Sequence, residues 1–287
     1  MRRRDASSDH STSGVVVIDI ETIVPNPPAG SGEGFVKWPH HQPVVASLLG
    51  ATALGEGRFR FWLDSILYES GREAAFYAAV DERIPPYGTL VGHNSTGFDI
   101  AALAIGAVGA RCFSAANLSK MQRTYRFGPL HADLAELYSN HGAAPRPSLA
   151  EVCGRLGVPV KVNTHGSEVA ELHAAGRIDQ IVAYCESDVA ATYAAWLHWA
   201  AWRDGDDALL AEPLAAFSRW IEASPERAHL LPVAQCEPAQ WARERALALS
   251  LDHARVRIER RARQERDERA FRSELVLADN DDDDLIF

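Results

Sequence analysis

Two acidic residues, Asp19 and Glu21, stand at the end of an apolar, β-branched run of strand length, residues 14–20. Since the side chains of a strand alternate between its two faces, residues two apart project from the same face, which would set these carboxylates side by side. Two such charges repel each other unless a cation lies between them. The pair therefore indicates a cation site. Taken alone, it has a simpler explanation, in which one acid caps the following turn and the other is solvated.

A second polar segment follows the short predicted strand Thr89–Gly92, which delivers His93 and Asn94. A glycine-containing turn comes next, and Asp99 opens a predicted helix over residues 99–108. An acid at this place is by itself explained as a cap or as a favourable charge at a helix N-terminus. The segment thus adds a third carboxylate whose role depends on its surroundings.

A third segment contains Tyr184 and Asp188, four residues apart in a predicted helix over residues 178–202. Residues at this spacing project from one face of a helix, with about 5–6 Å between their Cβ atoms. A core tyrosine with a solvated aspartate one turn later would explain this pair alone. The three segments together are far more specific than any one of them.

Their order and spacing resemble the DEDD-type 3′-5′ exonucleases of the DnaQ-like, ribonuclease H-like superfamily, in the tyrosine-bearing DEDDy subclass. VVVIDIET is similar to the first exonuclease motif, GHNSTGFD to the second and YCESDVAATY to the third. The closest resemblance is to predicted 3′-5′ exonucleases related to the proofreading domain of family B DNA polymerases, and it extends over residues 14–205.

The resemblance implies hydrolysis of phosphodiester bonds from the 3′ end of single-stranded nucleic acid, with DNA favoured. Two divalent cations about 3.5–4 Å apart, Mg²⁺ or Mn²⁺, would generate the nucleophile and stabilise the attacking and leaving oxygens. Asp19 would bridge both ions, Glu21 and Asp188 would complete the first site, and Asp99 would serve the second. Tyr184 would orient the attacking water, because a hydroxyl with a pKa of about 10 is a positioner more readily than a base.

Asn94 and Phe98 are predicted to contact the 3′-terminal nucleotide, by hydrogen bonding and by packing against sugar or base. His93 is interpreted as a residue that orders the strand end, because the histidine of the related DEDDh subclass belongs to the third motif. His40 and His41 border a proline-rich loop and are interpreted as surface residues that could rim the cleft.

The predicted fold is α/β, a ribonuclease H-like mixed sheet flanked by helices, with a C-terminal helical extension and an acidic tail. A β-hairpin is expected from residues 44–54 and 58–63. Trp196, Trp199 and Trp202 recur at every third position and are predicted to pack as one buried helix face. Further helices are expected over residues 72–83, 132–138, 148–156, 167–175, 209–223 and 238–277.

These elements suggest four regions along the chain. They are a disordered leader (1–13), an exonuclease domain (14–205), a helical extension with a long arginine-rich helix (206–277) and a disordered acidic tail (278–287). The arginine-rich helix supports one alternative, a catalytically inactive nucleic-acid-binding adaptor that works through this helix. The resemblance supports another, a 3′-5′ exoribonuclease, because other members of the superfamily trim RNA.

Composition bounds these interpretations. The chain has 287 residues with 29 basic and 39 acidic side chains, a net charge of −10 that argues against a nucleic-acid partner. Six of the acids lie in residues 274–287, so the remainder is much less acidic. No stretch approaches the roughly 20 apolar residues of a membrane helix, and the four cysteines lack zinc-ligand spacing, so a cytoplasmic enzyme with no membrane partner is expected.

The sequence DNDDDDLIF closes the acidic tail with Leu285, Ile286 and Phe287. It resembles the acidic tip of bacterial single-stranded-DNA-binding proteins, which docks on protein partners. The resemblance implies a partner that recognises this tip, or competition of the tail with DNA for a basic groove. A solvated tail without a partner is the remaining interpretation.

Overall fold

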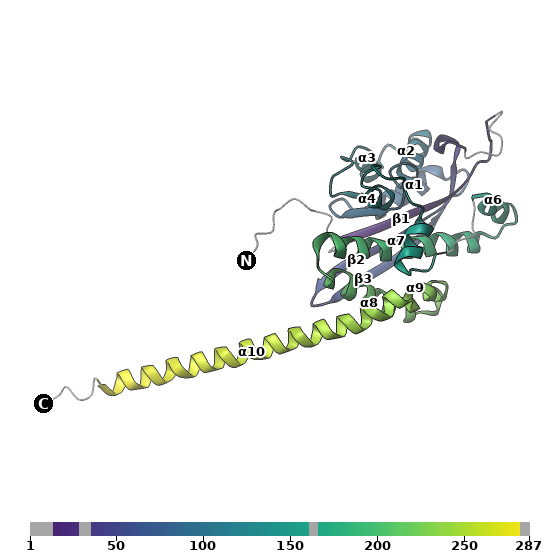
Figure 1. Ribbon diagram of the computed structural model, residues 1–287. Helices are drawn as coiled ribbons and strands as arrows, with labels where there is room; N and C mark the ends of the chain where they lie inside the picture. The colour runs from purple at the N-terminus through teal and green to yellow at the C-terminus, as the bar shows by residue number, and fades with distance from the viewer. Residues whose placement is uncertain (1–13, 29–35, 161–165, 282–287) are drawn as a thin grey trace.

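The computed structural model describes residues 14–28, 36–160 and 166–281 and centres on one five-stranded sheet (Figure 1). The strands lie in the order β3-β2-β1-β4-β5. The predicted leader and residues 282–287 of the predicted tail lie outside the described residues. The strands are β1 (Gly14–Ile23), β2 (Gln42–Gly55), β3 (Arg58–Leu67), β4 (Thr89–Gly92) and β5 (His131–Asp133).

The first three strands form an antiparallel meander, whereas β4 and β5 run parallel to β1. The predicted hairpin is confirmed, because β2 and β3 pair antiparallel around a turn at Glu56 and Gly57. Both turn residues adopt positive φ angles, 53° and 68°. This strand order, with helices on both faces, confirms the predicted ribonuclease H-like α/β fold.

The alternation of side chains along β1 divides the core into two layers. Val15 and Val17 belong to a cluster with the helices of the first layer, and Val16 and Ile18 belong to a cluster with those of the second. The first layer consists of α5 (Leu149–Leu156), α7 (Ile178–Asp204) and α8 (Ala208–Glu222), and the second of α1 (Glu73–Arg83), α2 (Asp99–Gly109) and α3 (Ala116–Gln122). By the period of two, Asp19 and Glu21 continue the face of β1 that packs against α7.

The prediction of a helix over residues 132–138 is wrong at its start. Residues His131–Asp133 form β5, and only α4 (Leu134–Tyr138) is helical. The strand exists because it pairs with β4, with Gly92 opposite Asp133, and three residues are too few to show a strand pattern in the sequence. Helix α3 has no counterpart among the predicted elements.

The predicted helices over residues 148–156, 167–175 and 178–202 are present as α5, α6 (Gly166–Ala174) and α7, with bounds within two residues. Helix α5 begins with a capping box, in which Ser148 accepts from the N–H of Glu151 while the Glu151 carboxylate accepts from Ser148. Such reciprocal bonds satisfy N–H groups that the first turn leaves without partners.

The tryptophans of α7 do not form one buried face, which corrects the prediction. Trp196 is fully buried and Trp199 is partly buried, but Trp202 is 79% exposed. At about 3.6 residues per turn, a step of three residues falls about 60° short of a full turn, so the third member of such a series has rotated away from the first. Arg203 covers part of the pair, with its guanidinium 4.9 Å from the Trp199 ring centroid.

Helix α8 belongs to the same core as α7, although it lies in the predicted extension. Phe217 is fully buried, and its ring lies 5.0 Å from that of Tyr193 and 5.3 Å from that of Phe61. The packing therefore continues without a gap across residue 205. The remaining short elements are η1 (Trp38–His40), η2 (Pro225–Leu230) and α9 (Leu231–Gln235).

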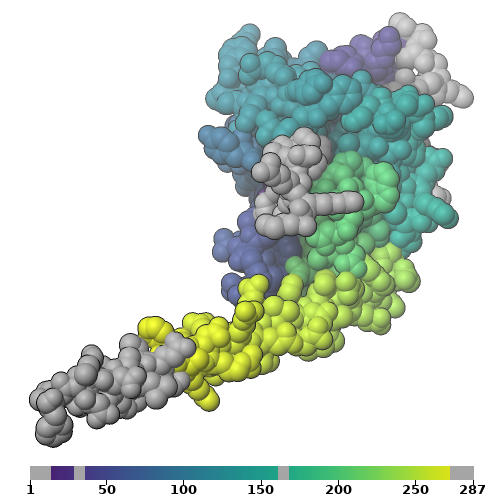
Figure 2. All heavy atoms as spheres, turned by 60° about the vertical axis from the view of Figure 1, so that its left-hand side comes forward, coloured from purple at the N-terminus to yellow at the C-terminus, as the bar shows by residue number. Residues whose placement is uncertain are grey.

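The predicted arginine-rich helix is present as α10 (Glu237–Asp281), which starts against α8 and then projects from the body (Figures 1 and 2). Arg243 pairs with Glu222 and Arg245 with Asp207, which fixes the first turns on α8. Farther along, the helix is mainly exposed. No helix in the described part of the chain has the length and hydropathy of a membrane span.

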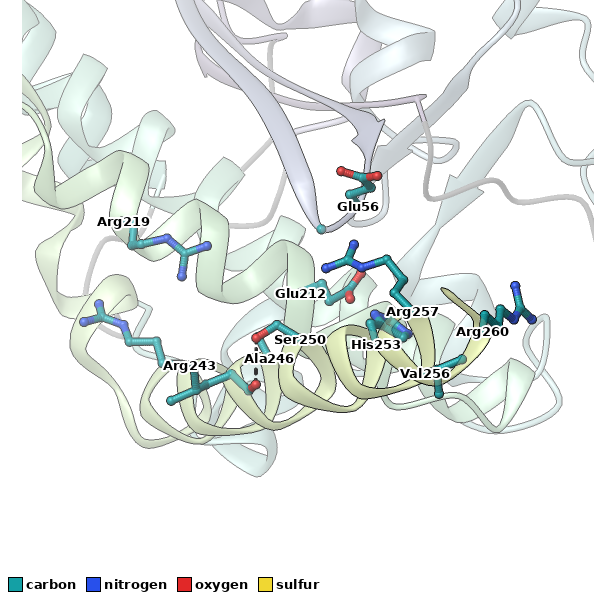
Figure 3. A pocket seen from close by; sticks show the side chains of 12 residues that line it. Glu56, Glu212, Arg219, Arg243, Ala246, Ser250, His253, Val256, Arg257 and Arg260 are labelled. Atoms are coloured by element: carbon teal, nitrogen blue, oxygen red, sulfur yellow. Dashed lines mark hydrogen bonds between the residues drawn. The ribbon is translucent and has the colours of Figure 1, made fainter. Parts of the chain in front are cut away.

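A hollow of about 690 Å³ lies between the β2–β3 turn, α8 and α10 (Figure 3). Since β1 and β2 are antiparallel, this turn lies beyond Gly14, at the opposite end of β1 from Glu21. The hollow is therefore separate from the predicted catalytic residues. Its charged lining consists of Glu56, Glu212, Arg219, Arg243, Arg257 and Arg260.

Candidate active site

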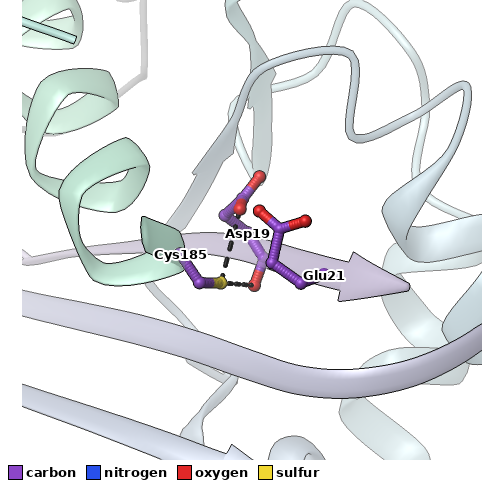
Figure 4. Close-up of side chains that lie close together, drawn as sticks. All are labelled: Asp19, Glu21 and Cys185. Atoms are coloured by element: carbon purple, nitrogen blue, oxygen red, sulfur yellow. Dashed lines mark hydrogen bonds between the residues drawn. The ribbon is translucent and has the colours of Figure 1, made fainter. Parts of the chain in front are cut away.

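Strand β1 brings the first two acids together. Asp19 pairs with Ser47 of β2 and Glu21 with Val45, and the register shifts immediately after Glu21. Their carboxylates lie on the same side of the strand, as the spacing predicts (Figure 4). At these two positions β1 is paired with β2 alone, because its pairing with β4 ends at Val17.

Asp99 reaches the same place from the other layer. It is the first residue of α2 and is 4% exposed. Its Oδ1 accepts the N–H of Ile20 at 3.1 Å, the residue between Asp19 and Glu21. The hydrogen bond forms where β1 extends beyond its pairing with β4, which ends at Val17↔Val91. Helix α2 therefore delivers a third carboxylate to the end of β1.

Helix α7 supplies the remaining predicted groups. Tyr184 and Asp188 lie on one face of the helix and share a side-chain hydrogen bond. The carboxylate of Asp188 is close enough to raise the pKa of both Asp19 and Glu21. The structure thus brings the four acids and the tyrosine, which are widely separated in the sequence, to one point.

The site gathers several carboxyl groups in a buried place, which raises their pKa values. Burial, and then the charges of Glu21, Asp99 and Asp188, hold the pKa of Asp19 well above its usual range. Burial, followed by Asp188 and Asp99, does the same for the pKa of Glu21. Burial, together with the charge of Asp133, raises the pKa of Asp99 to about 7, although two backbone N–H groups oppose the shift. Without a cation, the cluster therefore retains protons that isolated carboxyl groups would lose.

This donor set fits a hard divalent cation. Oxygen atoms of Asp19 and Glu21 and the sulfur of Cys185 lie within 4.8 Å of one another (Figure 4). Carboxylate oxygens are the ligands preferred by Mg²⁺ and Mn²⁺. Burial and the neighbouring acids raise the pKa of the Cys185 thiol well above its usual range, so it remains a hydrogen-bond donor. Asp19, Glu21, Asp99 and Asp188 would hold the cation.

A pH dependence of stability follows from the raised pKa values. A carboxyl group whose pKa is higher in the folded protein favours folding most below its unfolded pKa of about 4, and this contribution is lost as pH rises through the folded value. We expect the melting temperature of the metal-free protein to fall between about pH 5 and about pH 8. Mn²⁺ is expected to raise it more at the higher pH, because protons and cations compete for the same oxygens.

Thermal unfolding with chelator and with Mn²⁺ across this range measures both effects. The control is Asp99→Asn, which removes the charge at one of these carboxyl groups and should flatten the pH dependence. A metal-free melting temperature that rises with pH would contradict the assignment of these shifts.

The residues predicted to contact the 3′-terminal nucleotide lie next to the acids. Phe98 immediately precedes Asp99 and packs edge-on against His41, with ring centroids 4.9 Å apart. His41 is also bonded through Nδ1 to Thr22 Oγ1 at 2.7 Å, so it is fixed beside the end of β1. Asn94 is exposed, with a positive φ of 56°. Phe98 and His41 thus lie beside Asp99 and the end of β1, and Asn94 lies in the loop that leads into α2.

His93 and His40 are the other two histidines with a role predicted from the sequence. His93 Nε2 is 3.0 Å from the carbonyl oxygen of Pro147, which ties the end of β4 to the segment before α5. This contact is the ordering role predicted for His93. His40 is exposed at the end of η1.

Sequence reasoning missed two residues that support the site. The fully buried thiol of Cys185 lies 3.4 Å from both the backbone oxygen and Oδ2 of Asp19 and can donate to either (Figure 4). Asp133, at the end of β5, accepts hydrogen bonds from the loop between β4 and α2. Position next to Tyr184 could have indicated Cys185, but Asp133 depends on a strand that the sequence does not reveal.

The sheet order and the carboxylate cluster at the end of β1 define a ribonuclease H-like protein with an acidic site of the kind that binds divalent cations. The chain belongs to the family described as predicted 3′-5′ exonucleases related to the exonuclease domain of PolB, whose sequence model matches residues 33–231. The match contains Asp99, Tyr184 and Asp188 and begins after Asp19 and Glu21. The match ends beyond residue 205, the C-terminal limit expected from the motifs, and therefore includes α8.

A comparison with curated protein sequences gives no match. Among solved structures, the chain is similar to the family B DNA polymerase from the hyperthermophilic archaeon Pyrobaculum calidifontis, with 18% sequence identity and a TM-score of 0.41. The alignment covers 78% of this chain and 27% of the polymerase.

Proposed function

We propose that the protein is a 3′-5′ exonuclease of the DEDDy type that depends on divalent metal and acts on single-stranded nucleic acid, with DNA as the favoured substrate. The observation that carries the proposal is the convergence of Asp19, Glu21, Asp99 and Asp188 with Tyr184 at one end of β1. Membership of a predicted exonuclease family supports the same direction of hydrolysis.

The residues of the protein would have two roles, to hold the cations and to orient the attacking water. Two bound divalent cations, Mg²⁺ or Mn²⁺, would supply a hydroxide-like nucleophile near neutral pH and charge stabilisation at the scissile phosphate. Asp19, Glu21 and Asp188 would hold the first cation, with Asp19 shared by the second, which Asp99 serves. The fixed positions of these acids on β1, α2 and α7 limit the loss of conformational entropy on binding.

Tyr184 would act on the attacking water by orientation. Burial and the charges of Asp188, Glu21 and Asp19 raise the pKa of its hydroxyl far above neutral pH, so the group keeps its proton. A protonated phenol can hold a water molecule through a hydrogen bond but cannot remove its proton at pH 7. Tyr184 would therefore orient the water without binding a cation, whereas the carboxylates would bind the cations.

Asn94, Phe98 and His41 would form a rim that receives the terminal nucleotide. An aromatic edge and an exposed amide suit a sugar or base without demanding a particular sequence. Such a rim favours a single strand, because a paired terminal base could not pack against Phe98. The exoribonuclease alternative differs in its substrate, because an RNA strand carries a 2′-hydroxyl on each sugar and a DNA strand does not.

The direct test incubates the purified protein with Mn²⁺ or Mg²⁺ and matched DNA and RNA single strands labelled at the 5′ end. A 3′-5′ exonuclease should produce a ladder of shortening labelled strands, whereas digestion from the 5′ end would release the label at once as a mononucleotide. Faster shortening of DNA than of RNA is expected.

A strand with a blocked 3′ end and a reaction with chelator serve as controls and should show no shortening. If neither strand is shortened with either ion while binding persists in chelator, the adaptor alternative replaces the enzyme. This outcome would refute the proposed activity.

A further inference from the structure

A buried aspartate outside the predicted catalytic set holds the loop that carries Asn94. Asp133 is the last residue of β5 and is 5% exposed. Its Oδ1 accepts the N–H of Asn94 at 2.8 Å and that of Ala135 at 3.0 Å, and its Oδ2 accepts the N–H of Thr96 at 2.9 Å. One carboxylate therefore connects β5, the start of α4 and the loop after β4.

The neighbouring residue of the same strand face adds a fourth bond. His131 Nε2 lies 2.9 Å from Ser95 Oγ, and both side chains are buried. Three consecutive loop residues, Asn94 to Thr96, are thus bonded to β5. The backbone of Asn94 has a positive φ of 56°, in the left-handed region that asparagine adopts more readily than most residues, and these bonds hold it there.

The loop in turn sets the first turn of α2. The carbonyl oxygen of Asn94 accepts the N–H of Phe98 at 3.0 Å, and that of Ser95 accepts the N–H of Ile100 at 2.9 Å. Asp99 lies between these two anchored residues, with its carboxylate on the N–H of Ile20. Movement of the loop would therefore move Asp99 relative to β1, together with Phe98 on the rim.

The geometry requires a carboxylate rather than a neutral amide. Hydrogen bonds from N–H groups to an ionised acceptor are shorter and stronger than those to a neutral one. An asparagine at position 133 could accept bonds through only one of its two terminal atoms. If its oxygen took the place of Oδ1, its amide nitrogen would face the N–H of Thr96, donor against donor.

We infer that Asp133 is a positioning residue of the active site, which fixes the loop of Asn94 to Thr96 and through it Asp99 and Phe98. Its carboxylate acts through the backbone of the loop, and its charge also raises the pKa of Asp99. The inference rests on the proposed function for its activity readout, whereas its metal-binding and loop-order readouts are independent of turnover.

Asp133→Asn tests the inference with little risk to the fold, because asparagine caps helices as well as aspartate does and can retain the bond to Ala135. Loss of groups that orient metal ligands typically costs about 10–100-fold in metal affinity or activity. We expect kcat to fall by about this factor and the Mn²⁺ concentration at half-maximal activity to rise. KM for a single strand should also rise, because Phe98 moves with Asp99.

The matched control is Asp81→Asn. Asp81 is also buried, at 9% exposure, and its carboxylate accepts one backbone N–H, that of Leu118, at 2.7 Å. This bond joins α1 to α3 within the second layer, away from the loop of Asn94 to Thr96. A general loss of stability should therefore affect both variants, whereas changes in kcat and in Mn²⁺ dependence should be confined to Asp133→Asn.

Two measurements do not require turnover. Calorimetric titration with Mn²⁺ should show weaker binding to Asp133→Asn than to Asp81→Asn, and amide hydrogen exchange should show the N–H of Thr96 exposed only in the former. If both properties match those of the control, Asp133 is a structural residue and the inference is wrong. Weakened Mn²⁺ binding in Asp133→Asn, when the wild-type protein shortens no strand, would refute the proposed function and support the inference for the metal site.

Discussion

Asparagine in place of Asp19 is expected to reduce nucleotide release by about 10³-fold or more. Charge stabilisation by bound cations is worth several kcal/mol, and about 4 kcal/mol corresponds to a factor of about 10³ in rate. Asp19 lies at the centre of the acidic cluster, since the charges of Glu21, Asp99 and Asp188 each raise its pKa. Its replacement should therefore impair metal binding and turnover together.

The same variant, Asp19→Asn, should be more resistant to heat than the wild type in chelator. The amide that replaces the carboxylate is neutral, so the repulsion between this position and the remaining carboxylates is lost, while the side chain keeps its size. Initial rates with Mn²⁺, together with melting curves with and without the ion, measure both effects.

Asp64→Asn is a suitable control because it breaks only a partly exposed pair with Arg83, of a kind typically worth about 1 kcal/mol or less. A wild-type rate in Asp19→Asn would exclude this residue from the site. A melting temperature that Mn²⁺ raises as much as in the wild type would contradict its role as a ligand.

Phenylalanine in place of Tyr184 should separate orientation from metal binding. The variant keeps the ring and loses only the hydroxyl, which is bonded to Asp188 and stays protonated at neutral pH. Groups that act on the reacting proton or water typically contribute about 10²–10⁴-fold, and we expect a loss near 10² in kcat. The affinity for Mn²⁺, measured by calorimetry, should remain close to that of the wild type.

Tyr138→Phe provides the matched control. Its hydroxyl donates to the carbonyl oxygen of Ala195 at 3.0 Å, so this variant also loses one hydrogen bond of a tyrosine against α7. It should be somewhat less stable and fully active. A parallel loss of Mn²⁺ affinity and turnover in Tyr184→Phe would instead make the tyrosine part of the metal site.

The elements that carry strong local patterns were predictable. The alternation along β1 places Asp19 and Glu21 on one face, and the helical spacing of Tyr184 and Asp188 places them together on α7, whose start at Ile178 was also predicted. Convergence of these groups follows from the sheet topology, which the resemblance to a family supplied and the residues alone did not.

Features that depend on tertiary pairing were not predictable. The strand β5 is only as long as its pairing with β4, so the same residues resemble part of a helix in the sequence. Without this strand, nothing distinguishes Asp133 from an ordinary helix cap. Trp202 shows the converse error, because a regular spacing suggested burial where the helix had already turned its side chain to solvent.

The projection of α10 determines what its far end can reach. At a rise of about 1.5 Å per residue, the helix from Arg260 to Asp281 is about 30 Å long. That length matches about nine base-pair steps of about 3.4 Å. A molecule held at this end would therefore stand roughly one turn of duplex away from the body. The projecting part of α10 thus sets a distance of about 30 Å between the body and anything that its far end would contact.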